Sequence, residues 1–240
     1  MRGYPDVGLM TMNEAVESVG YIADAVEIPV ISDADNGYGN AINVRRTVAA
    51  FERAGAAGIH IEDQVWPKRC GHMLGKRVIP KEEMVQKIRA ALEARGDPHF
   101  VIIARCDALL VNGLEDTLAR GEAYLEAGAD MLFFEMRESL DEIHTIAERF
   151  RGRIPLHWNH SPSAMVPRLD TVELQRLGFK TACFYVHALM AACKTMREIL
   201  VEIKETGNAL SMRDRMVGFD EFWEICGLSK IRTLEKRYGA

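Results

Sequence analysis

The chain has 240 residues, of which 48% are hydrophobic and 27% charged, so it can form one substantial core and is predicted to be a single domain, residues 1–240. A formal net charge of −5 without a long basic run argues against nucleic acid or an anionic membrane as the partner and favours a small molecule. Five scattered cysteines and the lack of a long apolar run predict a reduced, cytoplasmic protein without disulfides or membrane spans.

Short apolar runs alternate with amphipathic stretches along most of the chain. The runs have the length of buried strands, and the stretches are long enough for two to four helical turns. In chain order we expect strand 28–31, helix 41–54, strand 58–61, helix 81–94, strand 100–104, helix 114–126, strand 131–134, helix 140–150, strand 154–158, helix 171–177 and strand 181–186.

Local signals support the helix starts. Ser139 with Glu142, and Asp170 with Glu173, have the spacing of an N-cap residue followed by an acidic third helical position. Pro80 is expected in the first turn of helix 81–94.

Regular alternation of continuously apolar strands with helices predicts an α/β protein with a parallel sheet. The position of the polar residues favours a TIM-type (β/α) barrel, because active-site residues of such barrels follow the carboxyl ends of successive strands. Five expected strands end in acid, base or amide groups: Asp33 and Asp35, Glu62 to Gln64, Arg105 to Asp107, Glu135, and His157 and Asn159.

Asp33 and Asp35 are candidate metal ligands. Residues two apart on a strand point to the same side, so their carboxylates are expected together, with Glu62 joining from the next strand. Such hard oxygen ligands suit Mg²⁺, which takes one or two protein carboxylates and keeps positions for water and substrate. The alternative is a solvated acidic loop.

The carboxyl ends of the strands form one edge of the sheet, called the rim below. Arg105 is expected at this rim, where its guanidinium could hold a carboxylate or a developing oxyanion. The alternative is a structural salt bridge to Glu135 or Asp107. The segment after the strand at 154–158 contains Asn159, Ser161 and Ser163. The amide and the two hydroxyls of these residues could bind a substrate carboxylate through hydrogen bonds. The alternative is an ordinary turn without a ligand.

Residues 65–80, the lid loop, have the composition of a mobile, cationic lid. Lysine and arginine on both sides, at 68–69 and 76–77, are expected to lower the pKa of Cys70. His72 is expected to exchange protons with that thiol when the loop closes over an anionic substrate. Cys-Gly-His by itself is weak evidence.

With motifs at 33–40, 58–64 and 68–72, the chain resembles the isocitrate lyase/phosphoenolpyruvate mutase superfamily from about Gly3 to its C-terminus. The resemblance implies a TIM-type (β/α) barrel of that kind that lacks its first two βα units, which leaves a partial barrel with exposed apolar strand edges. It also implies a homo-oligomer, dimer or tetramer, in which C-terminal helices at about 187–238 swap between neighbours.

The resemblance implies roles for the site residues. Asp33, Asp35 and Glu62 would hold Mg²⁺, with Mn²⁺ as a substitute, and Asp6 would lie near the metal. Substrate-binding or catalytic positions would be Cys70, Gly71, His72, Arg105, Glu135, Asn159, Ser161 and Ser163.

The leading hypothesis is a Mg²⁺-dependent carbon–carbon lyase that cleaves a small 2-hydroxy di- or tricarboxylate to a 2-oxo acid and a carboxylic acid. Substrates of the 2-methylisocitrate, isocitrate or 2,3-dimethylmalate type are all compatible with the motifs. Phosphorus–carbon chemistry like that of carboxyphosphonoenolpyruvate phosphonomutase, oxaloacetate hydrolysis and a catalytically inactive truncated barrel remain as alternatives.

Overall fold

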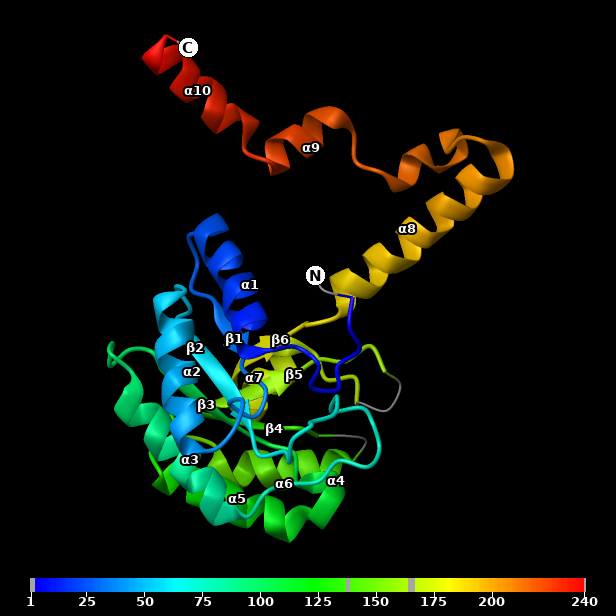
Figure 1. Cartoon of the computed structure of the whole chain (residues 1–240). Coiled ribbons are helices and arrows are strands. Elements are labelled where there is room, and N and C mark those ends of the chain that lie inside the picture. Colours follow the sequence, from blue (N-terminus) through cyan, green and yellow to red (C-terminus); the bar gives the residue numbers. More distant parts are fainter. Residues whose placement is uncertain (1–2, 137–138, 164–166, 240) are drawn as a thin grey trace. The chain divides into compact units, whose positions relative to one another are not determined.

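The computed structural model describes residues 3–136, 139–163 and 167–239, and it divides into two compact units, Met1–Phe184 and Tyr185–Ala240 (Figure 1). The first unit is an α/β half-barrel, and the second contains the C-terminal helices.

The first unit is built around one parallel sheet whose strands lie in chain order, from β1 to β6. Helices follow the strands and form the outer layer (Figure 1). The strands are β1 Ile31–Asp33, β2 Gly58–Glu62, β3 Val101–Cys106, β4 Met131–Phe134, β5 Leu156–Asn159 and β6 Phe179–Cys183. The helices of this unit are α1 Met12–Ala25, α2 Ala41–Arg53, α3 Lys81–Ala94, α4 Leu109–Asn112, α5 Leu114–Glu126, α6 Leu140–Phe150 and α7 Thr171–Leu177.

Helices α3, α5, α6 and α7 begin and end at the predicted residues. Asp170 accepts hydrogen bonds from the backbone N–H of Val172 and Glu173 and forms a full capping box, and Ser139 accepts one from Glu142. Pro80 lies one residue before the predicted position, as the N-cap of α3, with an extended ψ of 140°. The local capping signals therefore give the correct helix starts.

The first and last strands differ from the prediction. β1 starts at Ile31 and not at Ile28, because Pro29 has no backbone N–H to give to a ladder and Ile28 is 72% exposed. β6 starts at Phe179, directly after Gly178 ends α7 in the left-handed conformation at φ 102°, and it ends at Cys183. Ile31, in the edge strand β1, and Ile28, which precedes it, are both exposed.

The sheet separates two apolar regions. Ile102 and Phe134 face the helices and belong to the main core, whereas Ile103, Met131 and Phe133 form a separate cluster on the inner face. Residues one apart on a strand point to opposite faces, which explains the division. The inner cluster closes the half-barrel below the rim on which the polar residues lie.

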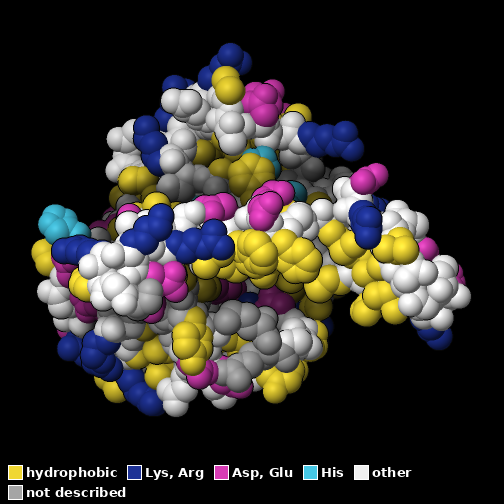
Figure 2. Space-filling view, turned by 90° about the horizontal axis from the view of Figure 1, so that it is seen from above, with side chains coloured by type: hydrophobic (Ala, Val, Ile, Leu, Met, Phe, Trp, Pro, Cys, Tyr) yellow, Lys and Arg dark blue, Asp and Glu magenta, His cyan; other side chains and the backbone are white. Residues whose placement is uncertain are grey.

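The second unit consists of α8 His187–Thr206, the 3-10 helix Leu210–Arg215, α9 Phe219–Ile225 and α10 Leu228–Tyr238, and none of these elements has a buried residue. Within the described residues, no helix is long and apolar enough to cross a membrane. On the face shown in Figure 2, Lys and Arg side chains are interspersed with Asp and Glu and form no large basic patch.

The close approach of α5 to the core requires a glycine. A Cβ at Gly121 would lie 2.5 Å from Phe150 Cζ and 2.7 Å from Phe134 Cζ. In Gly121→Ala, overpacking should cost about 1–3 kcal/mol, and the higher helix propensity of alanine should return at most ~1 kcal/mol. We therefore expect a net decrease in the free energy of unfolding.

Gly20→Ala in α1 is the matched control, because its Cβ would meet its nearest neighbour at 3.9 Å. This variant should be as stable as the wild type or more stable. Denaturant unfolding of the three proteins measures the difference. An equal loss at both positions would show that the close contact with the two phenylalanines is unimportant.

Candidate functional site

Asp33 and Asp35 are brought together by a turn. Asp33 is the last residue of β1, and Asp35 follows with a left-handed backbone at φ 46°, so that its N–H donates to Asp33 Oδ1 at 2.8 Å. The expectation that strand alternation pairs the two side chains was therefore wrong, because the strand has already ended. The predicted proximity of the two residues is nevertheless present.

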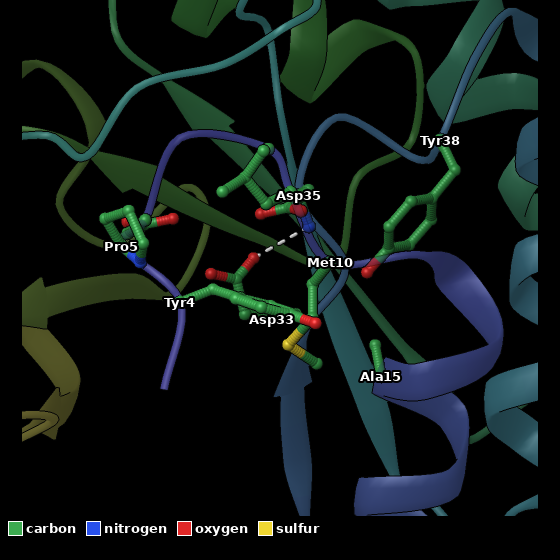
Figure 3. A pocket seen from close by; sticks show the side chains of 10 residues that line it. Tyr4, Pro5, Met10, Ala15, Asp33, Asp35 and Tyr38 are labelled. Carbon is green, nitrogen blue, oxygen red and sulfur yellow. Dashed lines mark hydrogen bonds between the residues drawn. The ribbon is translucent and has the colours of Figure 1, made fainter. Parts of the chain in front are cut away.

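The two aspartates line a cavity of about 210 Å³ at the rim. Figure 3 shows Asp33, Asp35 and Tyr38 around this space, together with Tyr4, Pro5, Met10 and Ala15. Asp6 lines the same cavity, and its expected place near a bound metal stays a prediction. Burial and the nearby Asp33 carboxylate raise the pKa of Asp35 to about 6, against the opposing charge of Lys68.

Lys68 of the lid loop neutralises this acidic group. Its Nζ lies 2.6 Å from Asp6 Oδ1 and 2.8 Å from Asp35 Oδ1, and its side chain is only 3% exposed. The backbone N–H of Cys70 also donates to the carbonyl of Asp6 at 3.0 Å. The lid loop is therefore closed onto the aspartates.

The pKa prediction for Cys70 was wrong. Burial raises the pKa of this thiol, and the carboxylates of Asp6 and Glu135 add to the rise. A hydrogen bond with the backbone of His72 and the charge of Lys68 oppose the rise only in part. Cys70 is accordingly held as a protonated thiol, the form that can give a proton.

Arg105 lies at the centre of a buried group of carboxylates. Its Nε lies 2.8 Å from Asp107 Oδ2, its Nη2 lies 3.2 Å from Glu135 Oε2, and its Nη1 lies 3.5 Å from Glu62 Oε2. The guanidinium also lies over the Phe133 ring at 4.8 Å. The salt bridges named as the alternative therefore exist, and they hold the guanidinium at the rim position predicted for it.

Glu62 is short of hydrogen-bond donors. Both of its carboxylate oxygens are buried and accept no hydrogen bond from the described part of the chain, and burial raises its pKa well above the ordinary value. No group of three or more His, Cys, Asp or Glu side chains among the described residues is arranged to hold a metal ion. A three-ligand site from Asp33, Asp35 and Glu62 thus stays a prediction.

Gly71 brings the lid loop against Arg105 and Glu135. A Cβ at Gly71 would collide with the Glu135 carboxylate and lie 3.0 Å from Arg105 Nη2, so only glycine allows this approach. His72, Glu135 and Asn159 line the same small hollow beside it. Together with Arg105 of β3, these predicted residues of the lid loop, β5 and the segment after β4 are brought together.

The turn after β5 contains the remaining predicted residues. The backbone N–H of Ser163 donates to Ser161 Oγ at 3.2 Å, so the turn is stabilised locally. Residues 164–166, which follow it, lie outside the described part. The proposed contact of this turn with a substrate carboxylate stays a prediction.

Sequence reasoning gave no role to Tyr38, counted Lys76 only among the cations of the lid loop, and named Asp107 only as a polar residue at a strand end and a possible salt-bridge partner of Arg105. Tyr38 lines the cavity, and Lys76 Nζ lies 2.9 Å from Asp107 Oδ1 in the interior. For Asp107, the one sequence feature that could have indicated a role in the site is its position directly after a strand, two residues beyond Arg105. Nothing in the sequence pairs Asp107 with Lys76.

Comparison with known proteins identifies the family of the chain. The family model described as phosphoenolpyruvate phosphomutase matches residues 1–204. This chain belongs to that family. A 2,3-dimethylmalate lyase of Eubacterium barkeri is 43% identical over 236 residues, 98% of this chain and 81% of the relative.

Two solved structures of family relatives are similar to the chain over nearly all of its length. One is a 2,3-dimethylmalate lyase of the PEP mutase/isocitrate lyase superfamily, with TM-score 0.91, 34% identity and coverage of 100% of this chain and 79% of that chain. The other is a phosphonopyruvate hydrolase in complex with oxalate and Mg²⁺, with TM-score 0.86, 34% identity and coverage of 98% and 82%. The predicted superfamily and the enzyme class, a carbon–carbon lyase, are confirmed.

Proposed function

We propose that the chain is a Mg²⁺-dependent lyase that splits the C2–C3 bond of a small 2-hydroxy dicarboxylate or tricarboxylate, with 2,3-dimethylmalate as the first candidate. The observation that carries the proposal is the closed lid loop, which places the protonated thiol of Cys70 near the Arg105–Glu135 pair and the paired aspartates. The similarity to a 2,3-dimethylmalate lyase supports the substrate class.

The rim suits a hard cation. Asp33 and Asp35 offer a pair of carboxylates, and Glu62 has two buried oxygens that accept no hydrogen bond from the described residues. Mg²⁺ commonly uses one or two protein carboxylates directly and reaches others through water, so the lack of three converging ligands is compatible with it. When bound, the ion would polarise the C2 oxygen and the neighbouring carboxylate of the substrate.

Residues of the chain itself would stabilise charge, transfer the proton and bind the substrate. Arg105 would stabilise the negative charge that develops on the departing carboxylic acid, and Glu135 would orient its guanidinium. The C2 hydroxyl of the substrate would give its proton to a carboxylate of the rim as the C2–C3 bond breaks. Cys70 would then protonate the new carbanion carbon, and His72 would restore the proton of the thiol. The closed lid loop would exclude water from this step, and Asn159, Ser161 and Ser163 would bind the far carboxylate of the substrate.

Phosphorus–carbon bond cleavage is the second candidate, because a phosphonopyruvate hydrolase is among the similar structures. Hydrolysis of phosphonopyruvate also forms a new carbon–hydrogen bond, because the pyruvate enolate that leaves phosphorus must gain a proton, so a thiol acid would serve either reaction. The 43% identity to a 2,3-dimethylmalate lyase favours the carbon–carbon reaction.

The first test measures pyruvate, glyoxylate or oxalate release from 2,3-dimethylmalate, 2-methylisocitrate, isocitrate, oxaloacetate and phosphonopyruvate. We expect turnover of a 2-hydroxy acid that is lost with EDTA and restored by Mg²⁺, and to a lesser degree by Mn²⁺. Turnover of phosphonopyruvate or oxaloacetate alone would replace the lyase proposal. The absence of turnover in a folded protein would favour an inactive half-barrel.

Cys70→Ser tests the proton donor. A hydroxyl is a far weaker acid than a thiol, so we expect kcat to fall by at least about a hundredfold, while the Mg²⁺ affinity measured by calorimetry stays unchanged. Cys193→Ser, at an exposed position in α8, is the control and should keep wild-type activity. If Cys70→Ser turns over at the wild-type rate, the thiol takes no part in the reaction.

We also propose that the second unit forms contacts between copies of the chain. Its helices carry large exposed apolar side chains, among them Leu200, Phe219 and Trp223, which a monomer would leave in water. We expect light scattering to give a dimer or tetramer. The double variant Phe219→Glu, Trp223→Glu should shift the measured molar mass towards that of the monomer. A wild-type protein that is already monomeric would contradict the proposal.

A further inference from the structure

Asp107 joins two buried cations at the end of β3. Its Oδ2 accepts a hydrogen bond from Arg105 Nε at 2.8 Å, and its Oδ1 accepts from Arg105 Nη2 at 3.1 Å and from Lys76 Nζ at 2.9 Å. The Asp107 side chain is fully buried, and that of Lys76 is 2% exposed. The carboxylate therefore has donors on both oxygens and no access to water.

The backbone around Asp107 is fixed as well. Its N–H donates to Asp63 Oδ1 at 2.8 Å, and the other oxygen of Asp63 accepts from Tyr124 and Arg120 at 2.7 and 3.1 Å. Asp107 is thus held by side chains that lie outside the lid loop as well as by Lys76. Although burial alone would raise it, Arg105 and Lys76 hold the pKa of Asp107 at about 2, so the group is ionised.

Lys76 lies in the lid loop, six residues after Cys70, whereas Asp107 and Arg105 belong to the sheet and its rim. Opening of the loop would remove Lys76 from Asp107 and leave Arg105 as the neighbouring cation. Asp107 would then compete more strongly with Glu135 for Arg105 Nη2, which contacts both carboxylates. Closure of the loop reverses this competition.

We propose that Lys76 and Asp107 are positioning residues that couple closure of the lid loop to the orientation of Arg105. With Lys76 in place, Asp107 holds Arg105 by Nε and Nη2, while Nη2 also reaches Glu135 and Nη1 lies beside Glu62, where the substrate carboxylate would lie. The role in turnover rests on the proposed function, but the coupling itself is a property of the ion pairs.

The test compares Lys76→Gln with Arg77→Gln, which removes the same charge from the next, exposed residue of the lid loop. Hydrogen exchange is measured for peptides covering 65–80 and 101–112, oxalate affinity is measured by calorimetry with Mg²⁺, and kcat and KM are measured on the substrate identified above. Thermal unfolding checks that both variants are folded.

We expect Lys76→Gln to speed exchange in both peptides, to weaken oxalate binding and to lower kcat by about tenfold or more, as loss of a group supporting a functional residue commonly does. KM should change less, because Arg105 acts mainly on developing charge. Arg77→Gln should resemble the wild type. Lys76→Arg, which keeps the charge, should recover most of the activity.

The proposal is overturned if Lys76→Gln exchanges like Arg77→Gln, or if it loosens only residues 65–80 while kcat and oxalate affinity stay at the control values. Failure of the proposed function is distinguishable from failure of this proposal. If the wild type turns over no substrate, the hydrogen-exchange rate of peptide 101–112 still shows whether Lys76 acts on the segment that contains Arg105 and Asp107.

Discussion

The burial of the Arg105 guanidinium among carboxylates is the interaction on which the rest of the rim depends. An unpaired cation at this depth would cost several kcal/mol, and the parallel register avoids this cost by placing Glu62 directly beside Arg105 on the neighbouring strand. Glu135 follows β4, and Asp107 follows β3 itself. The inner cluster around Phe133 closes the space beneath them. The same packing that makes the half-barrel therefore assembles a charged site.

The lid loop is held by the same kind of interaction. Lys68 binds Asp6 and Asp35 on one side, and Lys76 binds Asp107 on the other, and both lysines are nearly inaccessible to water. Loops seldom bury charges, and here each ammonium group meets a carboxylate already fixed by the rim. Cys70 lies between the two lysines, so the ion pairs that close the loop also determine where its thiol is presented.

Much of the architecture follows from local features of the sequence. The helices Lys81–Ala94, Leu114–Glu126 and Leu140–Phe150 agree with the prediction because apolar periodicity acts within a few residues, and Ser139 also caps the third of them. The bounds of β1 and β6 were less predictable, because a strand extends only as far as its neighbour pairs with it. Likewise, Asp33 and Asp35 were correctly paired, but the left-handed backbone at Asp35 was not foreseen.

The sequence by itself determined the alternation of strands and helices, the polar residues that follow the strands, and the motifs that mark the superfamily. Only the tertiary structure decided which charge pairs with which. Lys68 binds Asp6 and Asp35 and leaves the Cys70 thiol with a raised pKa, and Lys76 reaches Asp107 across 31 positions of the chain. The physical reason is that Coulomb energies and desolvation depend on distance and burial, which are known only once strand register and loop path are set.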